Sequence, residues 1–158
     1  MNMNTNATTP KHVVLADDDQ DHAFLFERIL KQVNPQHTLT VATDGSQLLQ
    51  LLLTQPPDVL FLDLRMPSKN GIECLKEIKN TPELNQLPVV VYSSSSKMTD
   101  IQRSYLHLAD LYMVKPFHTD HLQNALQAVL TMDLKQTTTI RNHYFINNRF
   151  VPFTATGF

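Results

Sequence analysis

The chain has 158 residues, a formal net charge of −2 and 42% hydrophobic residues, which suits one domain with a full hydrophobic core. This charge gives no general attraction for nucleic acid or anionic lipid, and the three scattered glycines exclude glycine-rich nucleotide-binding loops. One cysteine excludes an internal disulfide and a cysteine-based zinc site. The polar amino end and the short apolar runs predict neither a signal sequence nor a transmembrane helix, so we expect a cytoplasmic protein.

Five apolar runs of strand length alternate along the chain with longer segments of helical period. The runs cover residues 12–16, 38–42, 58–62, 87–92 and 111–114. Polar and apolar residues alternate in 38–42, which favours an edge strand, whereas the continuously apolar stretches 59–62 and 89–92 favour strands buried on both faces. Strict alternation of strands and helices predicts an α/β fold, with a parallel sheet covered by helices on both faces.

The segments between these runs carry apolar residues at steps of three and four, as amphipathic helices do. Their stripes are Ala23, Phe26, Leu30 and Val33; Ile72, Leu75 and Ile78; Met98, Ile101, Tyr105 and Leu108; and Leu122, Ala125, Leu126, Val129 and Leu130. Residues 46–54 are too uniformly apolar to show one face, but their length and leucine content favour a helix. Turn-forming pairs such as Asp44-Gly45 and Lys115-Pro116 stand between the elements.

The two ends of the chain differ from this pattern. Residues 1–10 are polar, and we expect them to be flexible. Residues 132–158, which we call the C-terminal extension, hold five of the 12 aromatic residues and a central Asn147-Asn148 pair. Asn tolerates the left-handed backbone of tight turns, so these residues favour a hairpin. An aromatic-rich segment is unfavourable in water, so we expect it to pack on its own domain or on a partner.

Acidic residues follow two of the predicted strands at the point where each strand ends. Asp17, Asp18 and Asp19 come directly after the first run, and Asp63 follows the third. Open parallel sheets bind ligands outside the carboxyl ends of their strands, and neighbouring first and third strands would bring these acids together. Clustered carboxylates raise one another's pKa unless a cation is present, and oxygen ligands with room for water suit Mg²⁺.

Complementary groups follow the fourth and fifth strands. Residues 93–96 are all serine, and Lys115 precedes Pro116 after the fifth run. A hydroxyl and an ammonium in the same crevice could hold the oxygens of a phosphoryl group. Acids, a cation, a hydroxyl and a lysine together indicate a site that forms an aspartyl phosphate.

These residues resemble the receiver domain of two-component response regulators, over roughly residues 11–131. The matching motifs are, in order, L-A-D-D-D, F-L-D-L-R-M-P-S-K-N-G, V-Y-S-S and M-V-K-P-F. Ser93 lies 30 positions after Asp63, and Lys115 lies 22 positions after Ser93, as in receiver domains. The resemblance implies a flavodoxin-like (βα)5 three-layer sandwich with strand order 2-1-3-4-5, ending before the C-terminal extension.

The resemblance also implies a role for each matching residue. Asp63 would accept the phosphoryl group, and Ser93, the backbone N–H of Ser94 and Lys115 would contact its oxygens. The Mg²⁺ ligands would be Asp18, the Asp63 carboxylate and the backbone carbonyl of Arg65, with Asp17 acting mainly through water. Ser93 and Tyr112 would be the switch pair, with the Tyr112 ring moving inward as Ser93 moves toward the phosphate. The bond between Lys115 and Pro116 would be cis.

The function implied is that of a stand-alone, single-domain bacterial response regulator. It would take its phosphoryl group from a histidine kinase or a histidine phosphotransfer protein, with Mg²⁺ as cofactor. It would be a switch that phosphorylates and dephosphorylates itself rather than a turnover enzyme. We expect no direct DNA binding and no membrane contact, and the signal would pass to a partner protein or through a homodimer.

Other interpretations stay open at this point. The same fold can act as a phosphorylation-independent interaction module, which would need a missing acceptor or a broken acid pair. A phosphatase of the haloacid-dehalogenase type wants a second Asp two residues after the first, where this chain has Arg65. Asp17 to Asp19 alone could cap a helix, and Tyr112 fits an ordinary core position equally well. We interpret the seven histidines as surface or capping residues, and Cys74 as a buried small hydrophobe.

Overall fold

The structure is a computed structural model, and it describes residues 9–154. Its elements are β1 (His12–Ala16), α1 (Gln20–Val33), β2 (Thr38–Ala42), α2 (Gly45–Thr54), β3 (Val59–Leu62), α3 (Gly71–Lys79), β4 (Val89–Ser93), α4 (Met98–Leu106), β5 (Leu111–Val114), α5 (Thr119–Thr131), α6 (Thr137–His143), β6 (Phe145–Ile146) and β7 (Arg149–Phe150). The prediction for residues 1–10 lies almost wholly outside the described residues. No helix within 9–154 has the length and apolar character needed to cross a bilayer.

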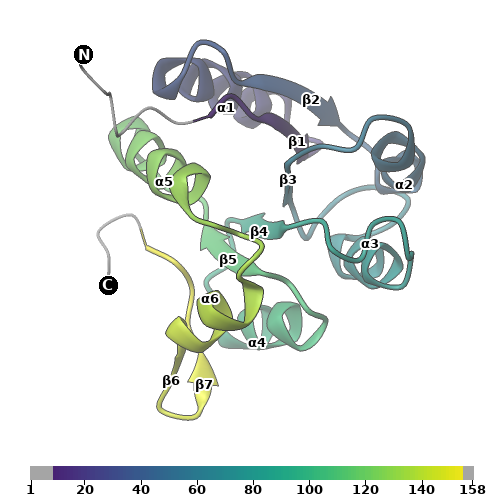
Figure 1. Cartoon of the computed structure of the whole chain (residues 1–158), viewed down its shortest axis with the longest axis vertical. Helices are drawn as coiled ribbons and strands as arrows, with labels where there is room; N and C mark the ends of the chain where they lie inside the picture. Colours follow the sequence, from purple (N-terminus) through teal and green to yellow (C-terminus); the bar gives the residue numbers. More distant parts are fainter. Residues whose placement is uncertain (1–8, 155–158) are drawn as a thin grey trace.

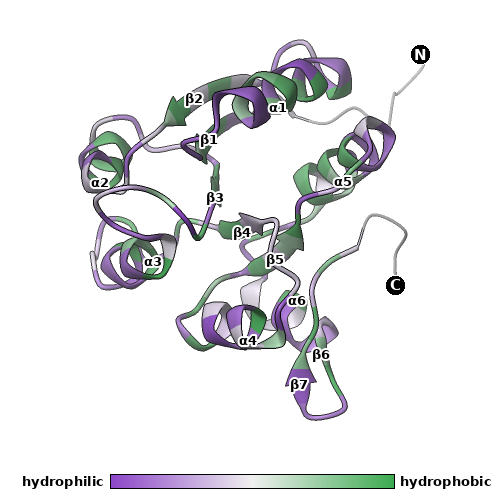
Figure 2. Cartoon of the chain, turned by 180° about the vertical axis from the view of Figure 1, so that it is seen from behind, coloured by the Kyte–Doolittle hydropathy of each residue, from purple (hydrophilic) through white to green (hydrophobic). Residues whose placement is uncertain are grey.

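Five parallel strands form one sheet in the order β2-β1-β3-β4-β5 (Figure 1), which confirms the predicted flavodoxin-like topology. Successive residues of β1 face opposite sides of this sheet, because side chains alternate along a strand. Val13 and Leu15 join one hydrophobic cluster with residues of α1 and α5, and Val14 and Ala16 join the other with residues of α2, α3 and α4. The helices of Figure 2 accordingly carry hydrophobic and hydrophilic colours on different sides.

Local signals in the sequence explain where three of the helices begin. The Asp19 carboxylate accepts hydrogen bonds from the N–H groups of Asp21 and His22, so it caps α1. Asp44 caps α2 in the same way through the N–H of Ser46. Asn70 and Glu73 form a reciprocal capping box at the start of α3. Each cap satisfies backbone donors that a helix end leaves unpaired.

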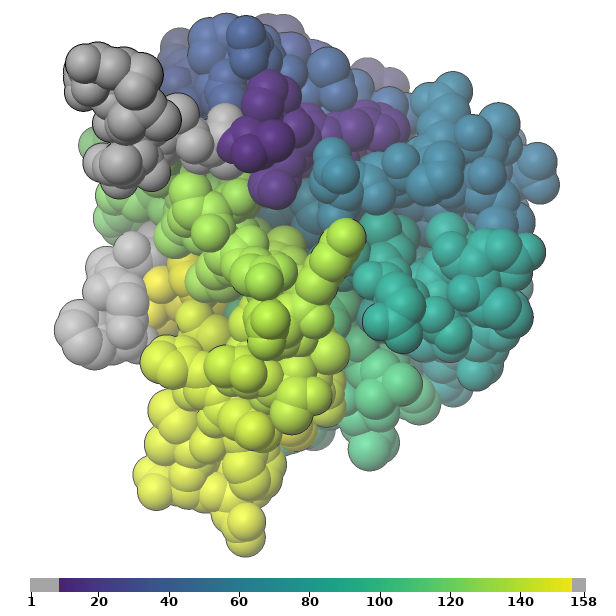
Figure 3. Space-filling model, in the orientation of Figure 1, coloured from purple at the N-terminus to yellow at the C-terminus, as the bar shows by residue number. Residues whose placement is uncertain are grey.

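The C-terminal extension forms α6 and an antiparallel hairpin of β6 and β7. Asn147 and Asn148 between the strands both have positive φ, at 52° and 68°, as the tightest hairpin turns require. The hairpin lies beside α4 and projects from the rest of the molecule (Figures 1 and 3). Phe153 then returns to the sheet and makes a parallel bridge with Met113 of the edge strand β5.

Cys74 lies in the hydrophobic cluster between the sheet and α2 to α4, as the sequence predicts for a small buried hydrophobe. Its side chain is 2% exposed, and its Sγ contacts the carbonyl oxygen of Gly45 at 3.6 Å. Burial raises the pKa of this thiol to about 11. The thiol therefore stays protonated and packs as an apolar group.

Candidate functional site

Backbone hydrogen bonds continue the sheet for one residue past β1 and β3, and this places two acids side by side. The N–H of Asp17 donates to the carbonyl of Ala42 at 2.9 Å, and the N–H of Asp63 donates to the carbonyl of Ala16 at 2.9 Å. Asp17 and Asp63 therefore hold fixed positions at the carboxyl end of the sheet, where an open parallel sheet binds its ligands.

The side chains of Asp17, Asp18 and Asp63 form one acidic cluster. Each offers a carboxylate oxygen, and these oxygens all lie within 4.8 Å of one another. Asp17 and Asp63 are 0% and 8% exposed, whereas Asp18 is open to solvent. Oxygen donors with one solvent-facing side are the ligand set that Mg²⁺ prefers, since Mg²⁺ keeps several waters. The residues present therefore fit a hard divalent cation.

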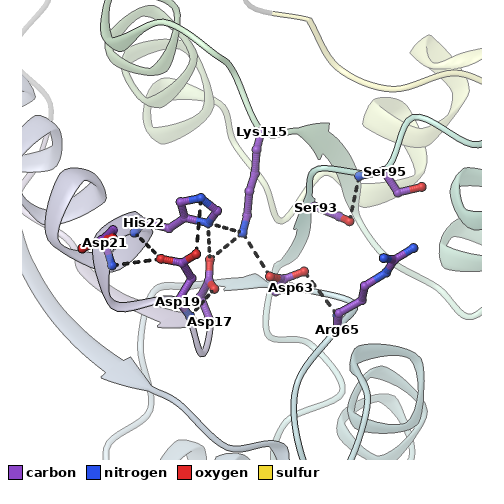
Figure 4. Close-up of polar contacts among 9 residues, drawn as sticks. All are labelled: Asp17, Asp19, Asp21, His22, Asp63, Arg65, Ser93, Ser95 and Lys115. Atoms are coloured by element: carbon purple, nitrogen blue, oxygen red, sulfur yellow. Dashed lines mark hydrogen bonds and ion pairs between the residues drawn. The ribbon is translucent and has the colours of Figure 1, made fainter.

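Lys115 is the cation that faces these acids (Figure 4). Its Nζ donates to Asp17 Oδ2 at 2.7 Å and to Asp63 Oδ2 at 3.0 Å. The backbone N–H of Lys115 donates to the backbone carbonyl of Ser93 at 2.8 Å, and this bond fixes the end of β5 against β4.

Three carboxylates face one lysine in this cluster, so negative charge is in excess. The pKa values of Asp63 and Lys115 are both shifted there. Burial raises the pKa of Asp63, and the Asp17 charge adds to this rise, while Lys115 opposes it. Burial alone would lower the pKa of Lys115, but its hydrogen bond to Asp17 and the charges of both acids raise it. A carboxylate held beside other carboxylates is stabilised in its charged form by any further cation that binds among them.

Ser93 ends β4 and is 2% exposed. Its hydroxyl oxygen accepts a hydrogen bond from the N–H of Ser95 at 3.1 Å, so it is directed at the loop after β4 rather than bonded to Asp63. Ser94, between them, is exposed. Ser93 thus ends β4 on the same side of the sheet as the acids (Figure 4), and the phosphoryl-binding roles of Ser93 and Ser94 stay predictions.

Tyr112 lies fully buried against the cluster of α4 and β4. Its hydroxyl donates to the carbonyl of Ser95 at 2.7 Å, and its N–H donates to the hydroxyl oxygen of Tyr105 at 2.9 Å. The ring is thus in the inward position of the two positions that the resemblance implies. Both interpretations of this residue, as switch or as core, agree with that burial.

Arg65 contributes its backbone to the site. Its N–H donates to Asp63 Oδ1 at 3.2 Å, which orients the carboxylate, and the predicted metal contact of its carbonyl stays a prediction. An open cleft of about 560 Å³ adjoins the acids, lined by Asp18, Arg65 and Arg103 among others. This cleft leaves the exposed side of the acidic cluster accessible.

The predicted cis bond before Pro116 is wrong. Residues 9–154 contain no cis peptide bond, so the bond between Lys115 and Pro116 is trans. The trans isomer is the preferred one for X–Pro bonds, by about 0.5–1 kcal/mol. The resemblance alone had implied the other isomer.

His22 is a site residue that the sequence analysis missed. Its Nδ1 lies 3.0 Å from Lys115 Nζ, and its Nε2 lies 3.6 Å from Asp19 Oδ2. It stands in the first turn of α1, five residues after Asp17, so helix geometry turns it back toward the strand end. Its position in the first turn after the acids was the sequence signal that could have identified it. Its contact with Lys115, however, depends on how α1 lies beside the end of β5.

Comparison with known proteins agrees with this geometry. The model of the response regulator receiver domain matches residues 13–127. The chain is 29% identical to the response regulator Rcp1 of Synechocystis sp. over 143 residues, which are 86% of this chain and 97% of Rcp1.

Solved structures give the same likeness. The Mn²⁺-bound form of response regulator Rcp1 matches with a TM-score of 0.69 and 30% identity over 79% of this chain and 95% of that one. The phosphorylated cyanobacterial phytochrome response regulator RcpA matches with a TM-score of 0.70 and 29% identity over 77% and 91% of the two chains. The residues matched by the family model include the acids, the serine loop and Lys115.

Proposed function

The chain belongs to the response regulator receiver domain family, and from this membership we propose that it is a single-domain response regulator phosphorylated on Asp63. The observation that carries the proposal is the shared position of three carboxylates and one lysine, with Lys115 Nζ 3.0 Å from Asp63 and 2.7 Å from Asp17. A cluster with excess negative charge is costly, and a bound cation would offset that charge. The cation and Lys115 would then neutralise the oxygens of a phosphoryl group.

In this proposal Asp63 Oδ attacks the phosphorus of a phosphohistidine in line, and the P–N bond breaks as the P–O bond forms. Lys115 neutralises the oxygens of the phosphoryl group, and the Ser93 hydroxyl and the Ser94 N–H bind them. Asp17, Asp18, Asp63 and the Arg65 carbonyl would hold Mg²⁺, which supplies charge neutralisation when bound. Binding of a divalent ion by a relative, the Mn²⁺-bound form of Rcp1, supports this part of the proposal.

A histidine kinase or phosphotransfer protein is the proposed donor, and the exposed surface beside the site supports it. Phe24 of α1 is 71% exposed and Phe117 after β5 is 98% exposed. Phe24 follows His22 by two residues and Phe117 follows Lys115 by two residues, so both positions are near in sequence to the contact between His22 and Lys115. Exposed large aromatic side chains mark interaction surfaces. The phosphorylated form of RcpA supports phosphoryl acceptance in a relative.

The switch in this proposal is the pair Ser93 and Tyr112, joined through the Ser95 loop. The chain acts in the cytoplasm as a regulator that loses its phosphoryl group by self-catalysed hydrolysis and turns over no separate substrate. The signal passes to a partner protein or through self-association.

The test is mass spectrometry of the intact chain after incubation with Mg²⁺ and acetyl phosphate. We expect an adduct of about 80 Da, the mass of one phosphoryl group, that is lost on mild alkaline treatment. Asp63→Asn should abolish it, and chelation of Mg²⁺ should suppress it. Asp120→Asn, an exposed aspartate on α5, is the matched control and should keep the adduct. An undiminished adduct in Asp63→Asn contradicts the assignment, and no adduct in the wild-type chain favours the phosphorylation-independent interaction module.

A further inference from the structure

We propose that the C-terminal extension is a regulatory element, whose docking on α4 and β5 is energetically coupled to the phosphoryl site and favours its binding-competent form. The inference rests on the proposed function, and it adds to that function a second element that sets how well the site binds. The extension lies beside α4 (Figures 1 and 3), and a continuous set of contacts leads from it to Ser93.

The first contact is made by Gln102 of α4, which bonds the backbone of the hairpin. Its side-chain oxygen accepts from the N–H of Phe150 at 2.9 Å, and its side-chain NH2 donates to the Phe150 carbonyl. One amide side chain thus satisfies both backbone groups of one residue, as a neighbouring strand would. The Phe150 ring stacks on Tyr105 with centroids 4.5 Å apart and an interplanar angle of 17°.

Arg141 of α6 makes the second contact. Its guanidinium donates to the carbonyl of Ala109 at 2.7 Å, just before β5. The same group lies over the rings of Tyr105 and Phe150, at 5.6 and 5.0 Å from their centroids. A planar guanidinium can stack and donate at once, so this one residue joins the extension to α4 and to the start of β5.

The third contact is along the edge of the sheet. The N–H of Phe153 donates to the carbonyl of Tyr112 at 2.7 Å, and the Phe153 ring is 6% exposed. At the other end of the extension, the Thr137 hydroxyl donates to the Asp110 carboxylate. The extension is therefore fixed to β5 from the residue before it to its centre.

A short series of hydrogen bonds continues from these contacts to the crevice. The Tyr105 hydroxyl, under the Phe150 ring, accepts from the N–H of Tyr112. The Tyr112 hydroxyl donates to the carbonyl of Ser95 at 2.7 Å. The N–H of Ser95 donates to the Ser93 hydroxyl at 3.1 Å. Each member of the series is buried or part-buried, so its position depends on its neighbours.

The series gives the coupling a physical basis. Its sign follows from the inward position of the Tyr112 ring, which the resemblance links to movement of Ser93 toward the phosphate. The docked extension restricts Tyr105 and Tyr112 to one arrangement, and the loop at Ser95 is held with them. A site that already has its binding arrangement does not lose affinity to competing arrangements. Coupling of this kind is reciprocal, so a phosphoryl group in the crevice must strengthen docking by the factor by which docking strengthens phosphoryl binding. An extension that merely covered α4 would stabilise the fold and leave the affinity unchanged.

The test measures beryllofluoride binding to the full chain in saturating Mg²⁺. Gln102→Ala and Arg141→Ala should each weaken binding about fivefold, which lies at the low end of typical coupling factors. The matched controls are Gln127→Ala on α5 and Arg28→Ala on α1, both exposed helix positions outside the series of contacts from the extension to Ser93. They should bind as the wild-type chain does. Circular dichroism and thermal unfolding establish that each variant is folded at the temperature used.

Hydrogen exchange gives the reciprocal measurement on the wild-type chain. Beryllofluoride should slow exchange of the Phe150 and Phe153 amides by about the same factor, because both donate across the docking contact. Unchanged or tighter beryllofluoride binding in the two folded variants overturns the inference while leaving the proposed function intact. A wild-type chain that binds no beryllofluoride overturns the proposed function, and the inference with it.

Discussion

Two buried pairs of a lysine and an aspartate lie at opposite ends of the same sheet. Before β5, Asp110 bonds Lys79 at 3.0 Å, the N–H of Val89 at 2.8 Å and the hydroxyl of Thr137. After β3, Asp63 bonds Lys115 at 3.0 Å and the N–H of Arg65 at 3.2 Å, and it shares that lysine with Asp17. The first aspartate is surrounded by donors, whereas the second stands among other acids.

This difference distinguishes the pair of Asp110 and Lys79, which stabilises the fold, from the pair of Asp63 and Lys115, which belongs to the proposed phosphorylation site. Donors satisfy the oxygens of Asp110, so its buried charge is compensated and it joins α3, β4 and the C-terminal extension. At the other end, three clustered carboxylates face one lysine, and burial raises the pKa of Asp63. Uncompensated buried charge is retained where a site uses it. The same two residue types therefore act as an anchor at one end and form the proposed phosphorylation site at the other.

The largest expected effect comes from breaking the anchor. Asp110→Ala removes the carboxylate that pairs with the buried Lys79 ammonium, which keeps its hydrogen bond to the Leu87 carbonyl, and it removes a bond to the extension. We expect the free energy of unfolding to fall by about 3–5 kcal/mol, as when one member of a buried pair is removed. Urea unfolding measures this. Asp120→Ala, at an exposed position, should change it by less than about 0.5 kcal/mol. A loss for Asp110→Ala as small as that of the control contradicts the anchor role.

The next effect concerns the backbone behind Asp63. A Cβ at Gly71 would lie 2.3 Å from the carbonyl oxygen of Asp63, so Gly71→Ala must displace one of the two segments. We expect a loss of about 1–3 kcal/mol in the free energy of unfolding, the usual cost of overpacking. The same displacement should slow adduct formation with acetyl phosphate. Full stability together with a normal rate would show that the crevice tolerates backbone movement.

A gain in stability is expected from a substitution at the end of the sheet that holds Asp63. Asp63→Asn removes a charge from a cluster with excess negative charge and leaves Asp17 to pair with Lys115. Without Mg²⁺ we expect the free energy of unfolding to rise by an amount on the order of 1 kcal/mol. Saturating Mg²⁺ should raise the stability of the wild-type chain more than that of the variant, because ligand binding stabilises the folded state. Thermal unfolding with Mg²⁺ and with EDTA checks both, and a loss of stability in the metal-free variant would make Asp63 a structural residue like Asp110.

The smallest expected effect is a pH dependence of the free energy of unfolding, at the end of the sheet that holds Asp110. The prediction that all seven histidines are surface or capping residues is wrong for His37, which lies just before β2 and is fully buried. Burial, followed by the charges of Lys11 and Lys31, lowers its pKa below 6.5. Its Nδ1 accepts from the N–H of Lys11 at 3.0 Å, while Nε2 has no partner within residues 9–154. The folded state thus favours the neutral ring. Its contribution to stability is complete above the unfolded pKa of about 6.5 and is lost as the pH falls through the folded value.

We expect this loss to be less than about 1 kcal/mol between pH 7.5 and pH 5.5. His37→Asn keeps an acceptor for the Lys11 amide and cannot titrate, so it should lose less stability than the wild-type chain over that interval. Urea unfolding of both chains at the two pH values measures the difference. An equal loss in the two chains would assign the pH dependence to other groups.

The sheet and the acidic cluster could be predicted because their signals are local and periodic. Apolar runs located all five strands, and Asp17 and Asp63 meet because each follows its strand by one residue. The hairpin at Asn147 and Asn148 has a local signal of the same kind, in two residues that tolerate positive φ. The domain boundaries at 11–131 and 132–158 stay a prediction.

What the sequence did not predict depends on contacts between distant elements. Asp110 stands before a strand like an ordinary turn residue, and only the fold brings Lys79 and Thr137 to it. Gln102 looks like any exposed residue of an amphipathic helix until the hairpin lies beside it. His22 contacts Lys115 because α1 starts beside the end of β5. No pattern within one segment reports such a juxtaposition.

The buried Cys74 makes the chain a convenient host for probes attached through sulfur. Thiol reagents attack the thiolate, and a pKa of about 11 with 2% exposure leaves almost none available at neutral pH. Because it is the chain's single cysteine, one introduced at the exposed tip of the hairpin could be labelled alone. A fluorophore or spin label at that tip would follow the hairpin's movement in real time, with no background from the native sulfur.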